Sequence, residues 1–346
     1  MTPGAERFAR VIRQFGPIPV AQYMAESNAM YYASRDPLGA AGDFITAPEI
    51  SQMFGEMIGL WCADLWQRAG SPDRIVWVEL GPGRGTLAAD ALRAMSSQKL
   101  RPDVHLVEAS PVLRTEQAKR VPQPVFHDAV DDLPTDRPIL IVANEFFDAL
   151  PVRQLVNTEG GWRERLVGLN DGALQFESGT KPMDDAVTAE RAEAPEGTIL
   201  ETCPSAAALW RDLCERVGEQ GGAIVAIDYG YLAARTGSTL QAVRRHEKVG
   251  VFDAPGDMDL TAHVDFATLA KIGADAGLTV RTGEQGAWLK ALGIEQRAQI
   301  LMQASSGGAD AVATAYQRLT YPDEMGTLFK VIAAVAPDWP EAAGFA

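Results

Sequence analysis

The stretch Glu79-Leu80-Gly81-Pro82-Gly83-Arg84-Gly85 directly follows an apolar run at residues 75–78. A short buried strand, a glycine-rich turn and then a helix, expected here over residues 85–95, form the pattern of a ligand-binding βα unit. The glycines let the backbone turn tightly and pass close to a ligand. Their spacing is Gly-x-Gly-x-Gly, which differs from the Gly-x-Gly-x-x-Gly of nicotinamide and flavin binders.

Around this turn, short apolar strands alternate with helices. Strands are expected at residues 75–80, 104–108, 124–127, 139–143, 223–227 and 278–282, and helices at 85–95, 111–119, 204–218 and 264–276. The strand at 139–143 is almost wholly apolar, as when helices cover both faces of a parallel sheet. The sequence therefore predicts an α/β fold with a Rossmann-like core, a mostly parallel sheet and helices on both faces.

The remaining segments indicate how this core is extended. Residues 1–70 are expected to form an N-terminal helical lid region, with helices at 5–15 and 49–69 and a loop-rich segment between them. Residues 71–346 would form the core, with insertions at about 152–200 and 285–320. The first insertion has the alternation and turn signals of an antiparallel meander, and the second is helical. A closing strand is expected at 328–335.

Composition narrows the class of protein. The 346 residues are 47% hydrophobic and 22% charged, which is typical of a globular chain. The net charge of −15 disfavours nucleic acid and anionic membranes as partners. No apolar run is long enough for a membrane-spanning helix. The cysteines Cys62, Cys203 and Cys214 lack the spacing of a disulfide framework or zinc site.

Polar residues follow the expected strands where their carboxyl ends meet. Glu79 precedes the glycines, where an acid would repel a pyrophosphate but suits a cationic, amino-acid-bearing ligand such as S-adenosylmethionine. Glu108 ends the second strand and can accept hydrogen bonds from ribose hydroxyls. Asp128 follows the third strand and is a candidate for the adenine amine, and Asn144 follows the fourth. Together with Gly81 and Gly83, these residues form the predicted cofactor site.

The segment after the fourth strand is the expected reaction side. Glu145 and Asp148 lie beside aromatic residues, and carboxylates pair with a planar guanidinium in a fork geometry. Asp228, which follows the fifth strand, is a further candidate for this wall. Helix capping or turn formation remains an alternative role for Asp148 and Asp228.

The four histidines lack the spacing of a metal site. His105 and His127 lie on or near expected strands, and His246 and His263 are distant in sequence. His263 is a candidate for the crevice, with a structural capping role as the alternative. No metal is therefore expected. The chain also lacks the Gly-x-Ser-x-Gly elbow of a serine hydrolase.

These motifs resemble those of the MidA-like methyltransferase family, and the matching stretches span nearly the whole chain. They are Gly16–Pro19, Tyr31-Tyr32, Gly42–Ser51, Phe54-Gly55-Glu56, Glu79–Leu87, Asn144–Val152, Asp228-Tyr229-Gly230, Thr239–Arg244 with His246, and Asp259–Phe266. The resemblance implies a class I methyltransferase core that binds S-adenosylmethionine and methylates arginine in a protein. Mitochondrial members of the family assist assembly of respiratory complex I.

Carried over by motif, the resemblance assigns Gly81, Gly83 and Glu108 to the cofactor and places Asn144-Glu145 beside the methyl group. It implies a lid or substrate wall, for which the candidates are Tyr32, Asp43, Thr46, Glu49 and His263. The sequence departs from the family at Ala29-Met30, where a glycine commonly precedes the paired tyrosines. The short N-terminus is expected of a bacterial, cytoplasmic member, with the mitochondrial matrix as the alternative.

Three other functions stay open at the level of sequence. A small-molecule methyltransferase would keep the cofactor site and add a closed apolar pocket. A non-catalytic assembly factor would bind the cofactor and transfer nothing. A nucleotide-dependent oxidoreductase is disfavoured by the glycine spacing.

Overall fold

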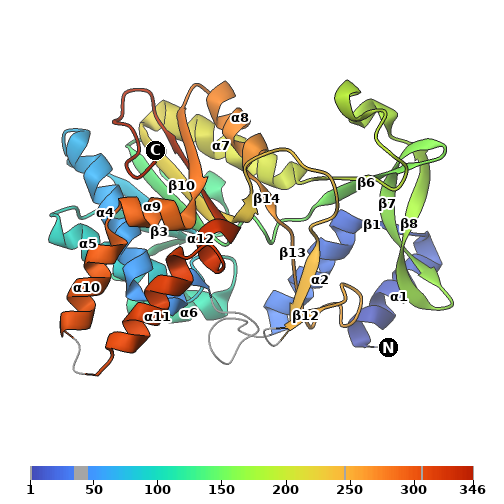
Figure 1. Cartoon of the computed structure of the whole chain (residues 1–346), viewed down its shortest axis with the longest axis horizontal. Coiled ribbons are helices and arrows are strands. Elements are labelled where there is room, and N and C mark those ends of the chain that lie inside the picture. The colour runs from blue at the N-terminus through green and yellow to red at the C-terminus, as the bar shows by residue number, and fades with distance from the viewer. Residues whose placement is uncertain (1, 35–45, 245–246, 305–306, 346) are drawn as a thin grey trace. The chain divides into compact units, whose positions relative to one another are not determined.

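The computed structural model describes residues 2–34, 46–244, 247–304 and 307–345 (Figure 1). The chain divides into two compact units. The sheet unit comprises Ile45–Phe147, Ala207–Leu232 and Phe266–Ala346, and the meander unit comprises Met1–Phe44, Asp148–Ala206 and Ala233–Asp265. The expected division at residue 70, between an N-terminal lid region and the core, stays a prediction.

The sheet unit contains the alternating strands and helices that the sequence predicts. Its strands are β2 (Val76–Leu80), β3 (Asp103–Val107), β4 (Val125–His127), β5 (Ile139–Asn144), β10 (Gly222–Tyr231), β15 (Thr279–Glu284) and β16 (Phe329–Val335). Its helices are α3 (Ala47–Ile50), α4 (Gln52–Arg68), α5 (Thr86–Ser97), α6 (Pro111–Arg120), α7 (Pro204–Gln220), α8 (Phe266–Asp275), α9 (Gln285–Ala291), α10 (Ile294–Ala304), α11 (Ala309–Thr320) and α12 (Met325–Leu328), with a 3₁₀ turn at Val130–Asp132.

The strands of this sheet run in the order β15-β16-β10-β5-β2-β3-β4. The pairs from β10 through β4 are parallel, and β16 is antiparallel to both β10 and β15. The predicted α/β fold with a mostly parallel sheet is therefore confirmed. The strand order reverses between β2 and β5, and such a switch point is where open α/β sheets bind their ligands.

Close helix packing fixes the helix that begins at the glycine turn. α5 follows the turn and packs against α4. Gly59 of α4 makes this contact tight, since a Cβ there would lie 2.3 Å from the carbonyl oxygen of Ala91. Any larger residue would push the two helices apart, so the absence of a side chain at Gly59 lets α4 lie directly against the backbone of α5 at Ala91.

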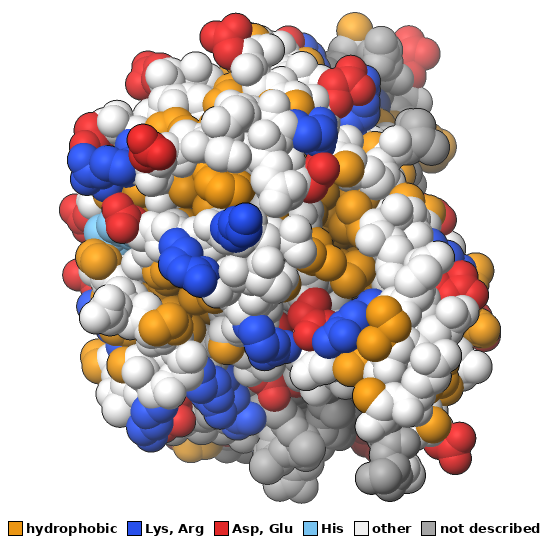
Figure 2. Space-filling view, turned by 90° about the vertical axis from the view of Figure 1, so that its left-hand side faces the viewer, with side chains coloured by type: hydrophobic (Ala, Val, Ile, Leu, Met, Phe, Trp, Pro, Cys, Tyr) orange, Lys and Arg blue, Asp and Glu red, His pale blue; other side chains and the backbone are white. Residues whose placement is uncertain are grey.

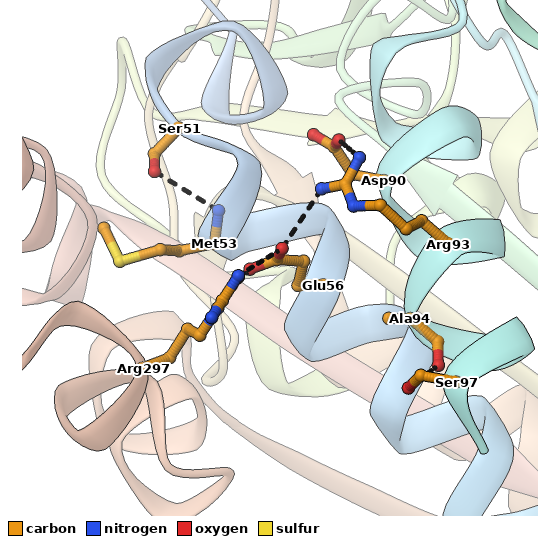
Figure 3. Close-up of polar contacts among 8 residues, drawn as sticks. All are labelled: Ser51, Met53, Glu56, Asp90, Arg93, Ala94, Ser97 and Arg297. Carbon is orange, nitrogen blue, oxygen red and sulfur yellow. Dashed lines mark hydrogen bonds and ion pairs between the residues drawn. The ribbon is translucent and has the colours of Figure 1, made fainter. Parts of the chain in front are cut away.

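An ion-pair network around a buried carboxylate ties the same helices to α10 (Figure 3). Glu56 of α4 is buried, and its carboxylate accepts hydrogen bonds from Arg297 at 2.7 and 2.8 Å and from Arg93 at 3.1 Å. Arg93 also pairs with Asp90 at 2.8 Å. The burial of Glu56 alone would raise its pKa, but the bonds from Arg297 and Arg93 outweigh it and lower the pKa.

The meander unit is built on two smaller sheets. Its elements are α1 (Pro3–Phe15), β1 (Ile18–Pro19), α2 (Val20–Ser34), β6 (Arg153–Thr158), β7 (Gly161–Asn170), β8 (Ala173–Pro182), β9 (Ile199–Thr202), β11 (Gln241–Arg244), β12 (Glu247–Val249), β13 (Asp259–Thr261) and β14 (Val264–Asp265). The strand orders are β1-β7-β6-β9, with β8 beside β7, and β12-β11-β13. The expected meander is thus present, extended by β1 and β9.

Residues 20–34 form a helix where the sequence indicated a loop-rich segment. Their apolar residues have weak helical periodicity, so the pattern did not reveal α2. Burial decides the outcome, because Tyr23, Met24 and Tyr31 are fully buried and the first two join a core with Phe8 of α1. Tertiary packing here overrides a weak local signal.

Charged side chains of both signs are interspersed on the face shown in Figure 2, with hydrophobic side chains between them. The acidic excess of the chain is therefore not gathered on this face.

Within the described ranges, no helix has the length and apolar character needed to cross a membrane.

Candidate functional site

The glycine turn between β2 and α5 needs backbone conformations that other residues rarely adopt. Gly81, Gly83 and Gly85 have φ of 59°, 52° and 79°. A Cβ at Gly81 would lie 2.8 Å from the ring of Phe146. The Gly81 N–H donates to the carbonyl of Val107 at 3.0 Å, which joins the turn to the end of β3.

Glu79 lies near the end of β2 with only 3% of its surface exposed. Its Oε2 has no hydrogen-bond partner among the described residues. Burial raises the pKa of Glu79 to about 8. A buried carboxyl group without full hydrogen bonding is costly and calls for an explanation. A cationic ligand at the glycine turn would supply one, because it would stabilise the ionised carboxylate.

Glu108 follows β3 and is held by two donors. Its Oε1 accepts from the N–H of Ser110 at 2.8 Å, and its Oε2 accepts from Gln117 Nε2 at 3.2 Å. Burial raises the pKa of Glu108. Asp128, after β4, has a largely exposed side chain whose Oδ1 pairs with Arg114 at 2.6 Å. Both predicted carboxylates thus stand at the carboxyl ends of neighbouring strands.

Asn144 ends β5, and Glu145 follows it with φ of 49°. A positive φ is strained for a residue with a Cβ, and such strain clusters at functional sites. The Glu145 Oε1 accepts hydrogen bonds from the Ala47 N–H at 2.9 Å and from Asn144 Nδ2 at 3.2 Å. The Oδ1 of Asn144 is buried without a partner in the described part of the chain.

Asp228 supports the turn that follows β5. Its Oδ2 accepts from the N–H groups of Phe146 at 3.2 Å and Phe147 at 3.0 Å, and its Oδ1 accepts from the N–H of Tyr229. The carboxylate is 1% exposed. Of the two roles that the sequence left open for Asp228, this geometry favours the turn former.

Two of the expected lid residues belong to the sheet unit. Thr46 precedes α3 at the N-cap position without a side-chain capping bond. Glu49 of α3 accepts a hydrogen bond from the Thr86 hydroxyl at 2.6 Å. Thr86 is the first residue of α5, directly after the glycine turn. The short helix α3 therefore lies against the glycine turn, which is where residues of a lid or substrate wall are expected.

The other expected residues belong to the meander unit. The hydroxyl of Tyr32 on α2 donates to Asp259 at 2.9 Å. Burial of that hydroxyl, with the charges of Asp259 and Asp148, raises the pKa of Tyr32 well above its usual value. Asp148 is buried. The backbone N–H of His263 donates to Thr239 Oγ1 at 2.8 Å. Asp43 lies outside the described residues.

The sheet-unit residues fit an adenosine-bearing cation. The turn offers backbone approach, Glu79 and Asn144 each present a buried oxygen without a partner among the described residues, and Glu108 is fixed by two donors. The described residues contain no cluster of metal-binding side chains. The sequence did not reveal Gln117, because its acceptors lie at the glycine turn and at the end of β3. It also did not reveal the Tyr32–Asp259 pair, because the two residues are far apart in the sequence.

The strand order and the glycine turn define a Rossmann-like α/β fold with a cofactor-binding turn, and the comparisons with known proteins identify the class as S-adenosylmethionine-dependent methyltransferases. Residues 57–283 match the family model described as S-adenosyl-L-methionine-dependent methyltransferase, and the chain belongs to this family. The resemblance to MidA-like methyltransferases and the expected cofactor are thereby confirmed.

The relatives cover nearly the whole chain. A protein named mitochondrial protein arginine methyltransferase NDUFAF7 from Xenopus tropicalis is 36% identical, over 96% of this chain and 87% of its own length. The Homo sapiens protein of that name is 33% identical, over 96% and 83%. A crystal structure from Burkholderia thailandensis, bound to S-adenosyl-homocysteine, is 30% identical with a TM-score of 0.85 and covers 98% of this chain and 93% of its own.

Proposed function

We propose that this methyltransferase transfers the methyl group to an arginine side chain of a protein substrate. Relatives named protein arginine methyltransferase are 33% to 36% identical to it over most of its length, which supports this acceptor. The observation that carries the proposal is the carboxylate of Glu145, held at the tip of β5 in a strained backbone conformation.

The cofactor side of the reaction rests on the sheet unit. S-adenosylmethionine supplies a methyl group on a positively charged sulfur, and the leaving thioether is neutral, so no acid is needed for it. Gly81 and Gly83 would let the backbone approach the cofactor, Glu79 and Asn144 would hold its charged amino-acid end, and Glu108 would hold the ribose. We assign Asp128 to the adenine edge.

Glu145 acts on the acceptor. An arginine side chain is protonated in water, with a pKa above about 12, so its guanidinium attracts a carboxylate. The two donors on Glu145 Oε1 fix the orientation of that carboxylate before the substrate arrives. A fixed carboxylate orients the guanidinium and stabilises its charge as the proton leaves. Within the sheet unit, Thr46 and Glu49 are the candidates for the substrate wall. The other candidates from the sequence, Asp148 for the guanidinium and Tyr32 and His263 for the wall, belong to the meander unit.

Replacing Glu145 by Gln tests this role. The change keeps the shape of the side chain and removes its charge, so methyl transfer should fall by roughly a hundredfold or more while the affinity for S-adenosyl-homocysteine changes little. The measurement is transfer of labelled methyl from S-adenosylmethionine to protein in an extract of cells that lack the gene, followed by hydrolysis to identify methylarginine.

The outcomes separate the candidate functions. Equal losses of transfer and of product affinity would reject the assignment of Glu145 to the acceptor. Label on a small molecule would favour a small-molecule methyltransferase. Binding of the cofactor with no transfer to any component would favour a non-catalytic assembly factor.

A narrower acceptor is a subunit of respiratory complex I, as the resemblance to the MidA-like family implies. The chain would then act in the bacterial cytoplasm or, as with its relatives named mitochondrial, in the mitochondrial matrix. Purified complex I from cells without the gene should accept methyl groups from this protein on arginine. Complex that accepts no label would exclude this acceptor and leave arginine methylation of another protein to be tested.

A further inference from the structure

One glutamine joins the glycine turn to the carboxylate at the end of β3. Helix α6 is mainly polar, yet the side chain of Gln117 is completely buried. Its Nε2 donates to the carbonyl of Gly83 at 2.7 Å and to Glu108 Oε2 at 3.2 Å. An amide NH₂ has two N–H groups, and in Gln117 one donates to each of these two acceptors.

The amide also shows why it is not an ordinary core residue. Gln117 Oε1 is buried without a hydrogen-bond partner among the described residues. Leaving a buried acceptor unsatisfied costs about 1–3 kcal/mol, which an apolar side chain of the same size would avoid. Another buried glutamine, Gln285, has the same unsatisfied oxygen, so what distinguishes Gln117 is that its two donated bonds reach the glycine turn and Glu108.

We propose that Gln117 is a positioning residue that sets the affinity for the cofactor. With Ser110 donating to one oxygen of Glu108 and Gln117 to the other, the carboxylate has one orientation relative to the glycine turn. A site fixed before the ligand arrives loses less conformational freedom on binding. This inference rests on the proposed role of Glu108 at the ribose, and it does not depend on the identity of the methyl acceptor.

The test is calorimetric titration of the purified protein with S-adenosyl-homocysteine. Gln117→Met keeps the volume, which matters because a Cβ at Gly85 would already lie 3.4 Å from Gln117 Cγ. Gln285→Met is the matched control. Gln285 is also fully buried, donates one bond to the Leu319 carbonyl at 3.0 Å and leaves its Oε1 without a partner in the described chain.

Gln117→Met should weaken S-adenosyl-homocysteine binding roughly tenfold, the loss expected for about one to two hydrogen bonds. The KM for S-adenosylmethionine should rise with kcat nearly unchanged, whereas Gln285→Met should alter neither. Both variants are expected to shift the melting temperature, so stability serves only to show that they fold. Affinity within about twofold of the wild type for Gln117→Met, or an equal loss for Gln285→Met, would overturn the proposal.

Gln117→Glu gives a readout that a purely structural role would not. Near pH 8 its carboxylate would face the Gly83 carbonyl and Glu108, so binding should be weaker than for Gln117→Met. Near pH 6 the buried carboxyl group of Gln117→Glu should take up a proton and donate one hydrogen bond. The affinity of this variant for S-adenosyl-homocysteine should then exceed that of Gln117→Met at the same pH. If the ratio of the S-adenosyl-homocysteine affinities of Gln117→Glu and Gln117→Met were the same at pH 6 and pH 8, the positioning role would be contradicted.

Discussion

Glu79 illustrates how a single carboxyl group links stability to cofactor binding. Its pKa is raised to about 8 by burial, above the ordinary value of 4.5 that applies in the unfolded chain. The folded protein therefore binds more protons than the unfolded one between these values. The stability associated with the protonated group is fully present below about pH 4.5 and is lost as the pH rises through about 8.

Glu79→Gln should remove that pH dependence. The amide stays neutral, so the variant should melt at a higher temperature than the wild type near pH 8 and at a similar temperature near pH 5. The same change should weaken binding of S-adenosylmethionine, because the cation loses its buried carboxylate. Thermal melts and titrations at both pH values provide the measurement. A variant that is less stable than the wild type near pH 8 would show that the carboxylate is not destabilised by burial.

The wild-type affinity should itself depend on pH. A cationic ligand lowers the pKa of Glu79, so binding releases a proton and tightens as the pH rises from about 6 to about 8. Calorimetry in buffers of different ionisation enthalpy would count the protons released. In Glu79→Gln the release should disappear, and its persistence would assign the proton to another group.

At the scale of elements, the contact of α4, α5 and α10 depends on Glu56. Glu56→Ala would leave Arg93 and Arg297 facing each other without their carboxylate. Because both arginines are partly exposed, the destabilisation should be about 2–3 kcal/mol, below the range for fully buried pairs. Urea unfolding would measure it. The lowered pKa of Glu56 predicts that this contribution is present above the unfolded-state pKa and is lost as the pH falls through the folded-state value.

The turn after β5, which contains Phe146 and Phe147, depends on Asp228 of β10. Asp228→Ala would leave the N–H groups of Phe146 and Phe147 without their acceptor, which should cost about 3 kcal/mol of stability for two bonds to a charged group. Asp228→Asn keeps one acceptor oxygen and should lose less. Methyl transfer should fall with the loss of turn geometry in both. Full stability of the alanine variant would favour the alternative placement of Asp228 in the substrate wall.

The elements of the sheet unit were predictable because their signals are local. Apolar strands such as β5 and the glycine turn need only neighbouring residues to be recognised. The helix α2 and the short strands β9, β11, β12 and β13 were not predicted. Their stability comes from contacts between segments far apart in the chain, as between Asn28 and the backbone of Leu260 at 2.8 Å.

At the scale of the whole molecule, the sequence predicted which strand ends carry polar residues but not what those residues contact. The positions of Glu79, Glu108 and Asn144 followed from the order of parallel strands. The bond of Glu145 to Ala47 and that of Glu108 to Gln117 did not, because they join segments whose approach depends on helix packing. Each of the two units collects three separate stretches of the chain, and such a grouping has no local signal in the sequence.

The most direct test of the proposed activity compares arginine methylation across the proteome of the source organism with and without this gene. The account predicts that at least one arginine-containing peptide loses its methyl groups when the gene is deleted. The wild-type gene should restore them, and the Glu145→Gln variant should not. A proteome in which arginine methylation is unchanged, while methylation of another residue type or of a small molecule is lost, would contradict it.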